Sequence, residues 1–353
     1  MLVLLVGGAS VYLSARNPAE ARIAQSLQKS SLDLRDAGVA LAVYSIGDDE
    51  RPGFMPCPDF DGDGTADVNC LSASNAVYAS RLPWKTIDVA REAGKFWYVM
   101  DSDFRDNSTA QPINVSLEGS ITLDGTPGYA ALIINPGDPL PGQTGRPGND
   151  VADYLEGENA DGDDVYQNCA GSDTCNDRIV GISVDQLMAI VQQRALGAVE
   201  SALRQFHADH GFVPFAAKFS GGSSCDVGQR WGRIATSEGS CIGSPHLTTG
   251  DFPNWLIDNE WLDHIAYNLD WECTQGQMQC GDSTHVLKSA SGLAVVLGAA
   301  GTELNGQSRG GGSSIDDYLD SEENTDNDGV FEDGPLAATD NDVMRGFALP
   351  TSP

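Results

Sequence analysis

The sequence predicts an α+β fold: a long N-terminal helix followed by two tandem modules, each a helix packed on an antiparallel sheet with long acidic loops. Three observations support this prediction. One helical pattern lies near the N-terminus, a second lies in the middle of the chain, and similar segments follow in the same order in both halves. The expected parts are the N-terminal helix at 1–46, a first module at 47–182 and a second module, with its own long helix, at 183–353.

The N-terminal segment is apolar over residues 1–13. This run is shorter than a membrane-spanning helix, which needs about 20 residues. We interpret it as part of a longer membrane or filament-core helix. Asn17 and Pro18 supply a cap and a first-turn proline, so the helix is expected to be regular from about 18 to 46. Its apolar positions Ile23, Leu27, Leu34, Leu41 and Tyr44 recur at helical spacing, so one stripe is expected to face a core.

The second helix is marked by Ser183 and Gln186, which form a capping box, and by an apolar stripe from Leu187 to Phe206. Each helical pattern leads to a Gly-Phe segment and then to a cysteine. So many matches in one order predict an internal duplication. Further matches are Pro83-Trp84 with Pro253 to Trp255, Asp153 to Glu156 with Asp317 to Asp320, and Asn176-Asp177 with Asn341-Asp342.

The charge of the chain limits its partners. The 51 Asp and Glu residues outnumber the 20 Lys and Arg residues, for a formal net charge of −31. Such a chain repels phosphate backbones and anionic membrane surfaces, and it attracts hard cations. Nucleic acid is therefore excluded as a partner, and metal sites are expected.

The eight cysteines fall into four close pairs with none left over. No pair is a C-x-x-C motif, and the five histidines do not lie at zinc-ligand spacing. Local disulfides in an oxidising compartment are predicted, with buried free thiols as the alternative. The pairs are Cys57 and Cys70, Cys169 and Cys175, Cys225 and Cys241, and Cys273 and Cys280.

The first acidic loop has carboxylates at alternate positions and a glycine, Gly64, at its sixth position. This arrangement is typical of calcium loops of the EF-hand kind, because alternate side chains point inward and the glycine permits a sharp turn. The usual Glu at the twelfth position is absent, and Cys70 stands there. The loop is similar to the disulfide-backed calcium loops of thrombospondin type 3 repeats. The predicted Ca²⁺ ligands are Asp59, Asp61, Asp63, Thr65 and Asp67.

Two further acidic clusters occupy matching places in the two halves. Both place oxygen-bearing side chains at alternate positions, which suits calcium better than magnesium. A solvated acidic loop without a bound ion is the alternative at all three places. The predicted ligands are Glu158, Asn159, Asp161 and Asp163 in the first half, and Asn324, Asp326, Asp328 and Glu332 in the second.

An enzyme is not predicted. Paired carboxylates could serve glycoside hydrolysis, but these acids lie in Gly, Asn and Asp turns and not among apolar residues that would raise a pKa. The chain has no G-x-S-x-G motif, and Gly310 to Ser314 lacks the lysine of a phosphate loop. The six tryptophans could form a carbohydrate-stacking face, although those at repeated positions are better interpreted as core anchors.

An apolar N-terminus that continues into a long helix, local disulfides and acidic loops together resemble the type IV pilin-like proteins, including the pseudopilins of type II secretion. A narrower resemblance is to a group of large prepilin-like proteins of Gram-negative bacteria. It is carried by the segments RPGFMPCPDFDGDG, RLPWKT, KFWYVMDSDF, ALIINPGDPLPGQ, DYLEGENADGDD, CNDRIVGIS and VDQLMAIVQQRALGAVESAL.

The resemblance implies a precursor anchored in the inner membrane and an extracellular or cell-surface filament, with copies of the chain and other pilin-like subunits as partners. It also implies calcium in a carboxy-terminal loop and packing of the N-terminal helix against neighbouring subunits. The residues predicted for this packing are Leu2, Leu4, Leu5, Val11, Ile23 and Leu27. The leading hypothesis is therefore a structural subunit of a type IV pilus-like filament, with heads stabilised by Ca²⁺ and disulfides. The alternative is a membrane-tethered or secreted calcium-dependent adhesin or binding module.

Overall fold

A computed structural model describes residues 18–68, 70, 77–106, 111–169, 174–304, 307, 314–333 and 340–351, with side chains from residue 29 onward. The chain forms two compact units. Unit 1 comprises residues 1–44, 55–105 and 120–182, and unit 2 comprises residues 45–54, 106–119 and 183–353. Two short segments of the first half of the chain therefore belong to unit 2.

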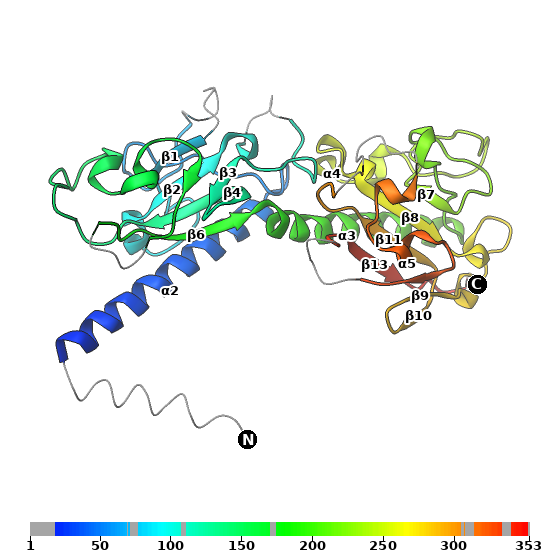
Figure 1. Cartoon of the computed structure of the whole chain (residues 1–353). Coiled ribbons are helices and arrows are strands. Elements are labelled where there is room, and N and C mark those ends of the chain that lie inside the picture. The colour runs from blue at the N-terminus through cyan, green and yellow to red at the C-terminus, as the bar shows by residue number, and fades with distance from the viewer. Residues whose placement is uncertain are drawn as a thin grey trace, which may run out of the picture. The chain divides into compact units, whose positions relative to one another are not determined.

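Unit 1 is built on a curled six-stranded sheet with the order β1-β2-β4-β3-β5, in which β6 also pairs with β4 (Figure 1). Neighbouring strands are antiparallel from β1 to β2 to β4 to β3, whereas β3 and β5 are parallel. The elements are the helix α2 (Pro18–Ile46) and the strands β1 (Val77–Arg81), β2 (Trp97–Asp101), β3 (Ile121–Leu123), β4 (Thr126–Asn135), β5 (Val165–Tyr166) and β6 (Arg178–Ser183).

The C-terminal half of α2 packs on this sheet through a stripe of apolar residues. Leu34, Ala37 and Leu41 follow one another at helical spacing and are buried. At the edge of the contact, the Arg178 guanidinium at the start of β6 donates a hydrogen bond of 3.0 Å to the Ser31 hydroxyl. The helix is thus held by an apolar stripe with a polar contact beside it.

Unit 2 contains a four-stranded antiparallel sheet with the order β13-β11-β8-β7 and a three-stranded sheet with the order β10-β9-β12. The long helix α3 packs on β11 and β13 (Figure 1). The helices are α3 (Val184–His210), α4 (Asn254–Asp258) and α5 (Glu322–Thr325), and the strands are β7 (Trp231–Arg233), β8 (Ile265–Leu269), β9 (His285–Leu287), β10 (Ala290–Leu293), β11 (Val295–Ala299), β12 (Val330–Phe331) and β13 (Val343–Phe347).

The ends of α3 follow local sequence signals. The Ser183 hydroxyl accepts a hydrogen bond from the Gln186 backbone N–H, and so caps the first turn. At the other end Gly211 adopts a φ of 80°, and its N–H bonds to the His207 carbonyl. A residue without a Cβ takes this left-handed conformation at little cost, so the helix ends there.

The two units repeat one another in detail. The order β6-β4-β2-β1 of unit 1 corresponds to β13-β11-β8-β7 of unit 2, and the described strands of each unit include a parallel pair, β3 with β5 or β9 with β12. The buried Tyr98 hydroxyl donates to the Pro56 carbonyl at 3.1 Å, and the buried Tyr267 hydroxyl donates to the Pro214 carbonyl at 2.8 Å. The matching segments of the sequence thus occupy matching places in the units.

The predicted fold class is nevertheless wrong, because the architecture is not that of a pilin. The described chain has four α-helices, a curled sheet and further sheets. Each unit also carries a parallel strand pair, so neither is a helix on a purely antiparallel sheet. Unit 2 recruits residues 45–54 and 106–119, so the units are not simple consecutive modules.

The regular helix predicted from about 18 to 46 is confirmed as α2, Pro18–Ile46, and residues 1–17 of the expected N-terminal segment lie outside the described residues. Leu2, Leu4, Leu5 and Val11 lie outside the described residues, and Ile23 and Leu27 lie in the part of α2 whose side chains are not described. Among the helices that are described, none combines the length and the hydrophobicity needed to span a bilayer.

Candidate metal and ligand sites

The eight cysteines predicted to form disulfides do so. Sequence neighbours are joined in every case, across separations of 6 to 16 residues, and no cysteine is free. Four disulfides are typical of an oxidising, extracellular or secreted environment. The bonds are Cys57–Cys70, Cys169–Cys175, Cys225–Cys241 and Cys273–Cys280.

The first acidic loop brings three of its predicted ligands together. Carboxylate oxygens of Asp59, Asp61 and Asp67 lie within 4.8 Å of one another. Asp59 is buried, and its two oxygens accept hydrogen bonds of 2.7 Å from the backbone N–H groups of Gly62 and Gly64. Burial raises the pKa of Asp59 above its ordinary value despite these bonds. A cation bound at this loop would stabilise the ionised carboxylate of Asp59 and so offset the free-energy cost of burying its charge.

Gly64 is required by the loop on two counts. Its φ is 91°, a conformation that L-residues rarely adopt, and a Cβ at this position would overlap the indole of Trp84. The other two predicted ligands bond to each other: the Asp63 carboxylate accepts hydrogen bonds from the N–H and hydroxyl of Thr65, which hold the pKa of Asp63 below its ordinary value. These two residues stabilise the turn.

The second and third acidic loops share one hydrogen-bond pattern. Asn159 donates to the carbonyl of Gln167 and accepts from its N–H at 2.9 and 2.8 Å. Asn324 makes the same two bonds with Glu332, both at 2.9 Å. These two asparagines are buried and close their loops, whereas the exposed Glu158, Asp161 and Asp163 bring carboxylate oxygens within 4.8 Å of one another.

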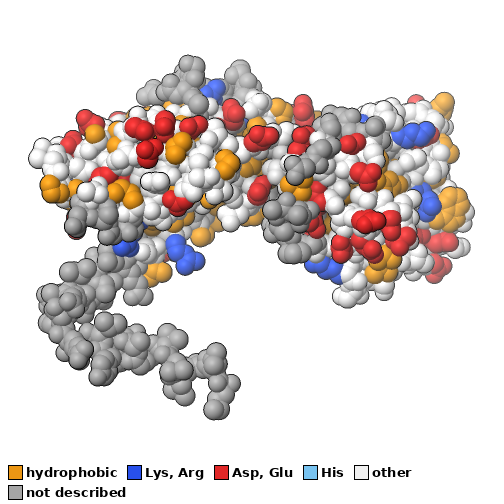
Figure 2. All heavy atoms as spheres, in the orientation of Figure 1, with side chains coloured by type: hydrophobic (Ala, Val, Ile, Leu, Met, Phe, Trp, Pro, Cys, Tyr) orange, Lys and Arg blue, Asp and Glu red, His pale blue; other side chains and the backbone are white. Residues whose placement is uncertain are grey.

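In the third loop the predicted set is not the one that converges. Among the described residues, carboxylates of Asp320, Asp340 and Asp342 lie within 4.8 Å of one another, and the predicted Asp326, Asp328 and Glu332 are not in that group. The Glu332 carboxylate instead accepts a hydrogen bond from the Ser321 hydroxyl. In the sequence, Asp342 was indicated by the match between Asn341-Asp342 and Asn176-Asp177. Figure 2 shows Asp and Glu side chains gathered in patches on the visible face, with few Lys or Arg among them.

A buried aspartate lies beneath the second loop. Asp177 is fully buried, and it accepts hydrogen bonds from the Glu156 N–H at 3.1 Å and the Asn159 amide at 2.9 Å. Burial raises its pKa to about 6. In unit 2, Asp342 accepts from the Asp320 N–H at 2.5 Å in the same way. These aspartates hold the loops on the sheets.

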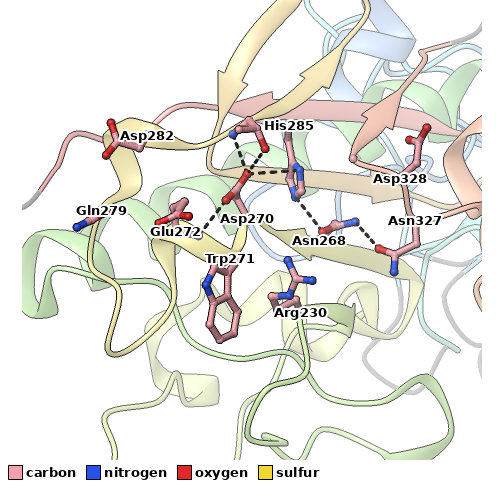
Figure 3. Close-up of a pocket in the computed structure, with 12 residues that line it drawn as sticks. Arg230, Asn268, Asp270, Trp271, Glu272, Gln279, Asp282, His285, Asn327 and Asp328 are labelled. Atoms are coloured by element: carbon pink, nitrogen blue, oxygen red, sulfur yellow. Dashed lines mark hydrogen bonds and ion pairs between the residues drawn. The ribbon is translucent and has the colours of Figure 1, made fainter.

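Sequence reasoning missed a pocket of about 400 Å³ in unit 2. Its floor consists of the buried residues Asn268 at the end of β8, Asp270 just after it and His285 at the start of β9 (Figure 3). His285 Nε2 lies 3.0 Å from the Asn268 side-chain oxygen, and its Nδ1 lies 3.7 Å from an Asp270 oxygen. The rim residues include Arg230, Trp271, Glu272, Asp282, Asn327 and Asp328.

Electrostatics of the floor favour a neutral imidazole. Burial lowers the pKa of His285 below its ordinary value, and this outweighs the opposite influence of Asp270. Burial also acts to raise the pKa of Asp270, but hydrogen bonds from Thr284 and Glu272 prevail and hold it below its ordinary value. The floor therefore carries one carboxylate and an uncharged histidine at neutral pH.

The tryptophans lie in different surroundings. At the repeated positions Trp97 and Trp255 are buried, as expected of core anchors, whereas Trp84 is half-buried; Trp261 is buried as well. Trp271 is 47% exposed at the pocket rim. In the sequence, Trp271 was indicated only as one of the six tryptophans that could form a carbohydrate-stacking face. Comparison of the chain with protein-family models, with curated proteins and with solved structures finds no match.

Proposed function

We propose that the chain is a non-enzymatic extracellular binding module whose acidic loops bind calcium. The observation that supports this most directly is the convergence of Asp59, Asp61 and Asp67 in a loop closed at both ends by the Cys57–Cys70 bond. Calcium takes six to eight oxygen ligands in a flexible geometry, and carboxylates, backbone carbonyls and water all serve. A loop fixed by a disulfide loses less conformational entropy when it binds an ion.

The charge of the chain supports the same proposal. At a net charge of −31 the acidic loops repel one another and the rest of the surface. The second loop again places three carboxylates, of Glu158, Asp161 and Asp163, within 4.8 Å of one another. Divalent cations at such places would neutralise charge and fix loop geometry together, which stabilises the folded state.

Calcium is expected to raise the thermal stability of the protein, and excess chelator is expected to reverse the effect. An ion present at about 100 times its dissociation constant stabilises a folded protein by about 2.7 kcal/mol per site. Isothermal titration calorimetry and thermal unfolding measure the two quantities. Asp59→Asn should weaken binding at the first loop, since it removes a charge and keeps the shape of the side chain.

The matched control for this experiment is Asp258→Asn, which removes an exposed carboxylate outside the acidic loops. It should leave both calcium affinity and the stabilisation unchanged. Equal stability in calcium and in chelator, or equal losses in the two variants, would contradict the proposal. Magnesium at the same concentration serves as a second comparison, because it demands a stricter octahedral site.

A second candidate is a subunit of a pilus-like filament at the cell surface, made from an inner-membrane precursor. Leu32, Val39 and Val43 of α2 are 52%, 64% and 58% exposed. Their spacing of seven and four residues places them on one face of the helix, as in helices that pack on partner helices. Other copies of the chain or related subunits would cover this face.

This candidate predicts concentration-dependent assembly that fails when the face is charged. Val39→Asp with Val43→Asp should abolish the large species seen by analytical ultracentrifugation and electron microscopy. Ile190→Asp is the control, since Ile190 is a similarly exposed apolar residue, at 45%, on α3. A chain that is monomeric at every concentration, or variants that assemble equally well, would eliminate the filament candidate.

A further inference from the structure

We propose that the pocket of unit 2 binds one or two rings of a neutral, hydroxyl-rich carbohydrate. This inference rests on the proposed function as a binding module and supplies its ligand class. The pocket volume of about 400 Å³ lies in the range of small-molecule sites. Three independent features support a sugar: a buried polar floor that folding does not require, a rim of mixed charge, and a half-exposed indole.

Unit 1 serves as an internal comparison for the pocket floor. Asp270 accepts hydrogen bonds of 2.9 Å from the Glu272 N–H and of 2.7 and 2.9 Å from the N–H and hydroxyl of Thr284. Asp101 of unit 1 accepts the same three bonds, one from Asp103 and two from Ser120. This aspartate therefore joins two strands in both units, and its role in unit 2 is structural.

The residues beside that aspartate differ between the units. Two positions before Asp101 and one position after Ser120, unit 1 has Val99 and Ile121, both fully buried in its apolar core. The corresponding residues of unit 2 are Asn268 and His285. Burial of polar side chains costs free energy unless all their hydrogen bonds are made. Asn268 and His285 satisfy part of this need by bonding to each other at 3.0 Å. Because unit 1 forms the same place with an apolar pair, the polar pair is not needed for this strand arrangement, and a ligand that bonds to it would account for it.

The rim has both signs of charge. Its carboxylates, those of Glu272, Asp282 and Asp328, would repel an anion, whereas Arg230, whose guanidinium carbon lies 5.7 Å from the Trp271 ring centroid, would repel a cation at the indole. A neutral hydroxyl group suits both sides, since it donates to a carboxylate and accepts from a guanidinium. A sugar ring presents several such hydroxyls in fixed positions.

The indole of Trp271 supplies the remaining contact. It is 47% exposed and stands at the rim beside the polar floor (Figure 3). The flat C–H face of a sugar ring buries apolar area against an exposed aromatic ring, while the hydroxyls at its edge reach the polar groups. Trp271 is the only Trp, Tyr or Phe in the described pocket lining.

The test uses the whole chain with a panel of neutral sugars: glucose, galactose, mannose, N-acetylglucosamine and disaccharides of each. Binding is measured by tryptophan fluorescence and calorimetry. Asn268→Val with His285→Ile installs the residues of unit 1, and it should keep or raise the melting temperature while weakening sugar binding about tenfold or more, or 1.4 kcal/mol. Trp271→Ala truncates a half-exposed side chain at the rim and should weaken binding as much.

The control variant is Ile242→Ala, which truncates an exposed apolar residue outside the pocket and should bind sugars normally. Absence of binding to every neutral sugar, preference for uronic acids or for spermidine, or unchanged affinity in Trp271→Ala would each overturn the inference. Calcium titrations on the same samples separate it from the proposed function. Calcium binding without sugar binding defeats only this inference, and sugar binding without calcium binding defeats only the calcium proposal.

Discussion

Gly232→Ala is expected to lower the free energy of unfolding by about 3 kcal/mol, at the upper end of the cost of overpacking a core. Gly232 lies in the middle of β7, opposite Tyr267 of β8. A Cβ at this position would overlap the backbone carbonyl oxygen of Ala217, which is fully buried. Ala217 cannot move away freely, because its N–H and carbonyl both bond to Arg233 at 2.9 Å. The added methyl group must therefore push the segment around Ala217 away from β7, which is the edge strand of the four-stranded sheet.

The matched control is Gly197→Ala in the helix α3, where a Cβ would meet nothing within 4 Å. This change should raise the free energy of unfolding by about 0.5–1 kcal/mol, since alanine is the better helix former. Urea unfolding followed by circular dichroism measures both values. Equal stabilities of the two variants would show that the close approach at Gly232 is absent in solution.

The double variant Cys225→Ala with Cys241→Ala is expected to lose about 3 kcal/mol of stability, because the bond closes a separation of 16 residues. Both sulfurs are also buried in a small cluster with Ala217 and Ala235, so their loss leaves unfilled space. This cluster holds the loop segments that flank β7. The effect of the disulfide therefore adds to an effect of packing.

The corresponding change at Cys169 and Cys175 should cost less, about 2 kcal/mol, since that bond spans only 6 residues and its cysteines are partly exposed. Chemical denaturation without reductant gives the two values, and reductant should bring the parent protein toward the variants. A larger loss at Cys169 and Cys175 would show that loop closure does not govern these stabilities.

Predictions from the sequence were correct where one short segment determines the local structure. Ser183 and Gln186 lie within one helical turn and predict the start of α3. The disulfides likewise join sequence neighbours. The fold class failed because strand pairing is not local. The parallel pair β3 and β5 joins strands of three and two residues, too short for any periodicity to mark them.

The candidate sites show the same limit. The first acidic loop lies within nine residues, so its spacing alone indicated the convergence of Asp59, Asp61 and Asp67. The cluster of Asp320 with Asp340 and Asp342 depends on where β13 begins, which the sequence did not reveal. The pocket of unit 2 joins the ends of two strands, and no motif connects Asn268 with His285.

The composition of unit 2 bears on the order in which the protein is made. Residues 45–54 and 106–119 leave the ribosome long before 183–353, with which they fold. Polar groups of these two segments bond to residues that are made much later. The Asn114 amide donates to the Asn259 carbonyl at 2.9 Å, and the Ile46 carbonyl accepts from the Arg194 guanidinium at 2.7 Å. Unit 1 is complete once residue 182 has emerged, so it can fold during synthesis, whereas unit 2 must assemble around segments that the ribosome released earlier.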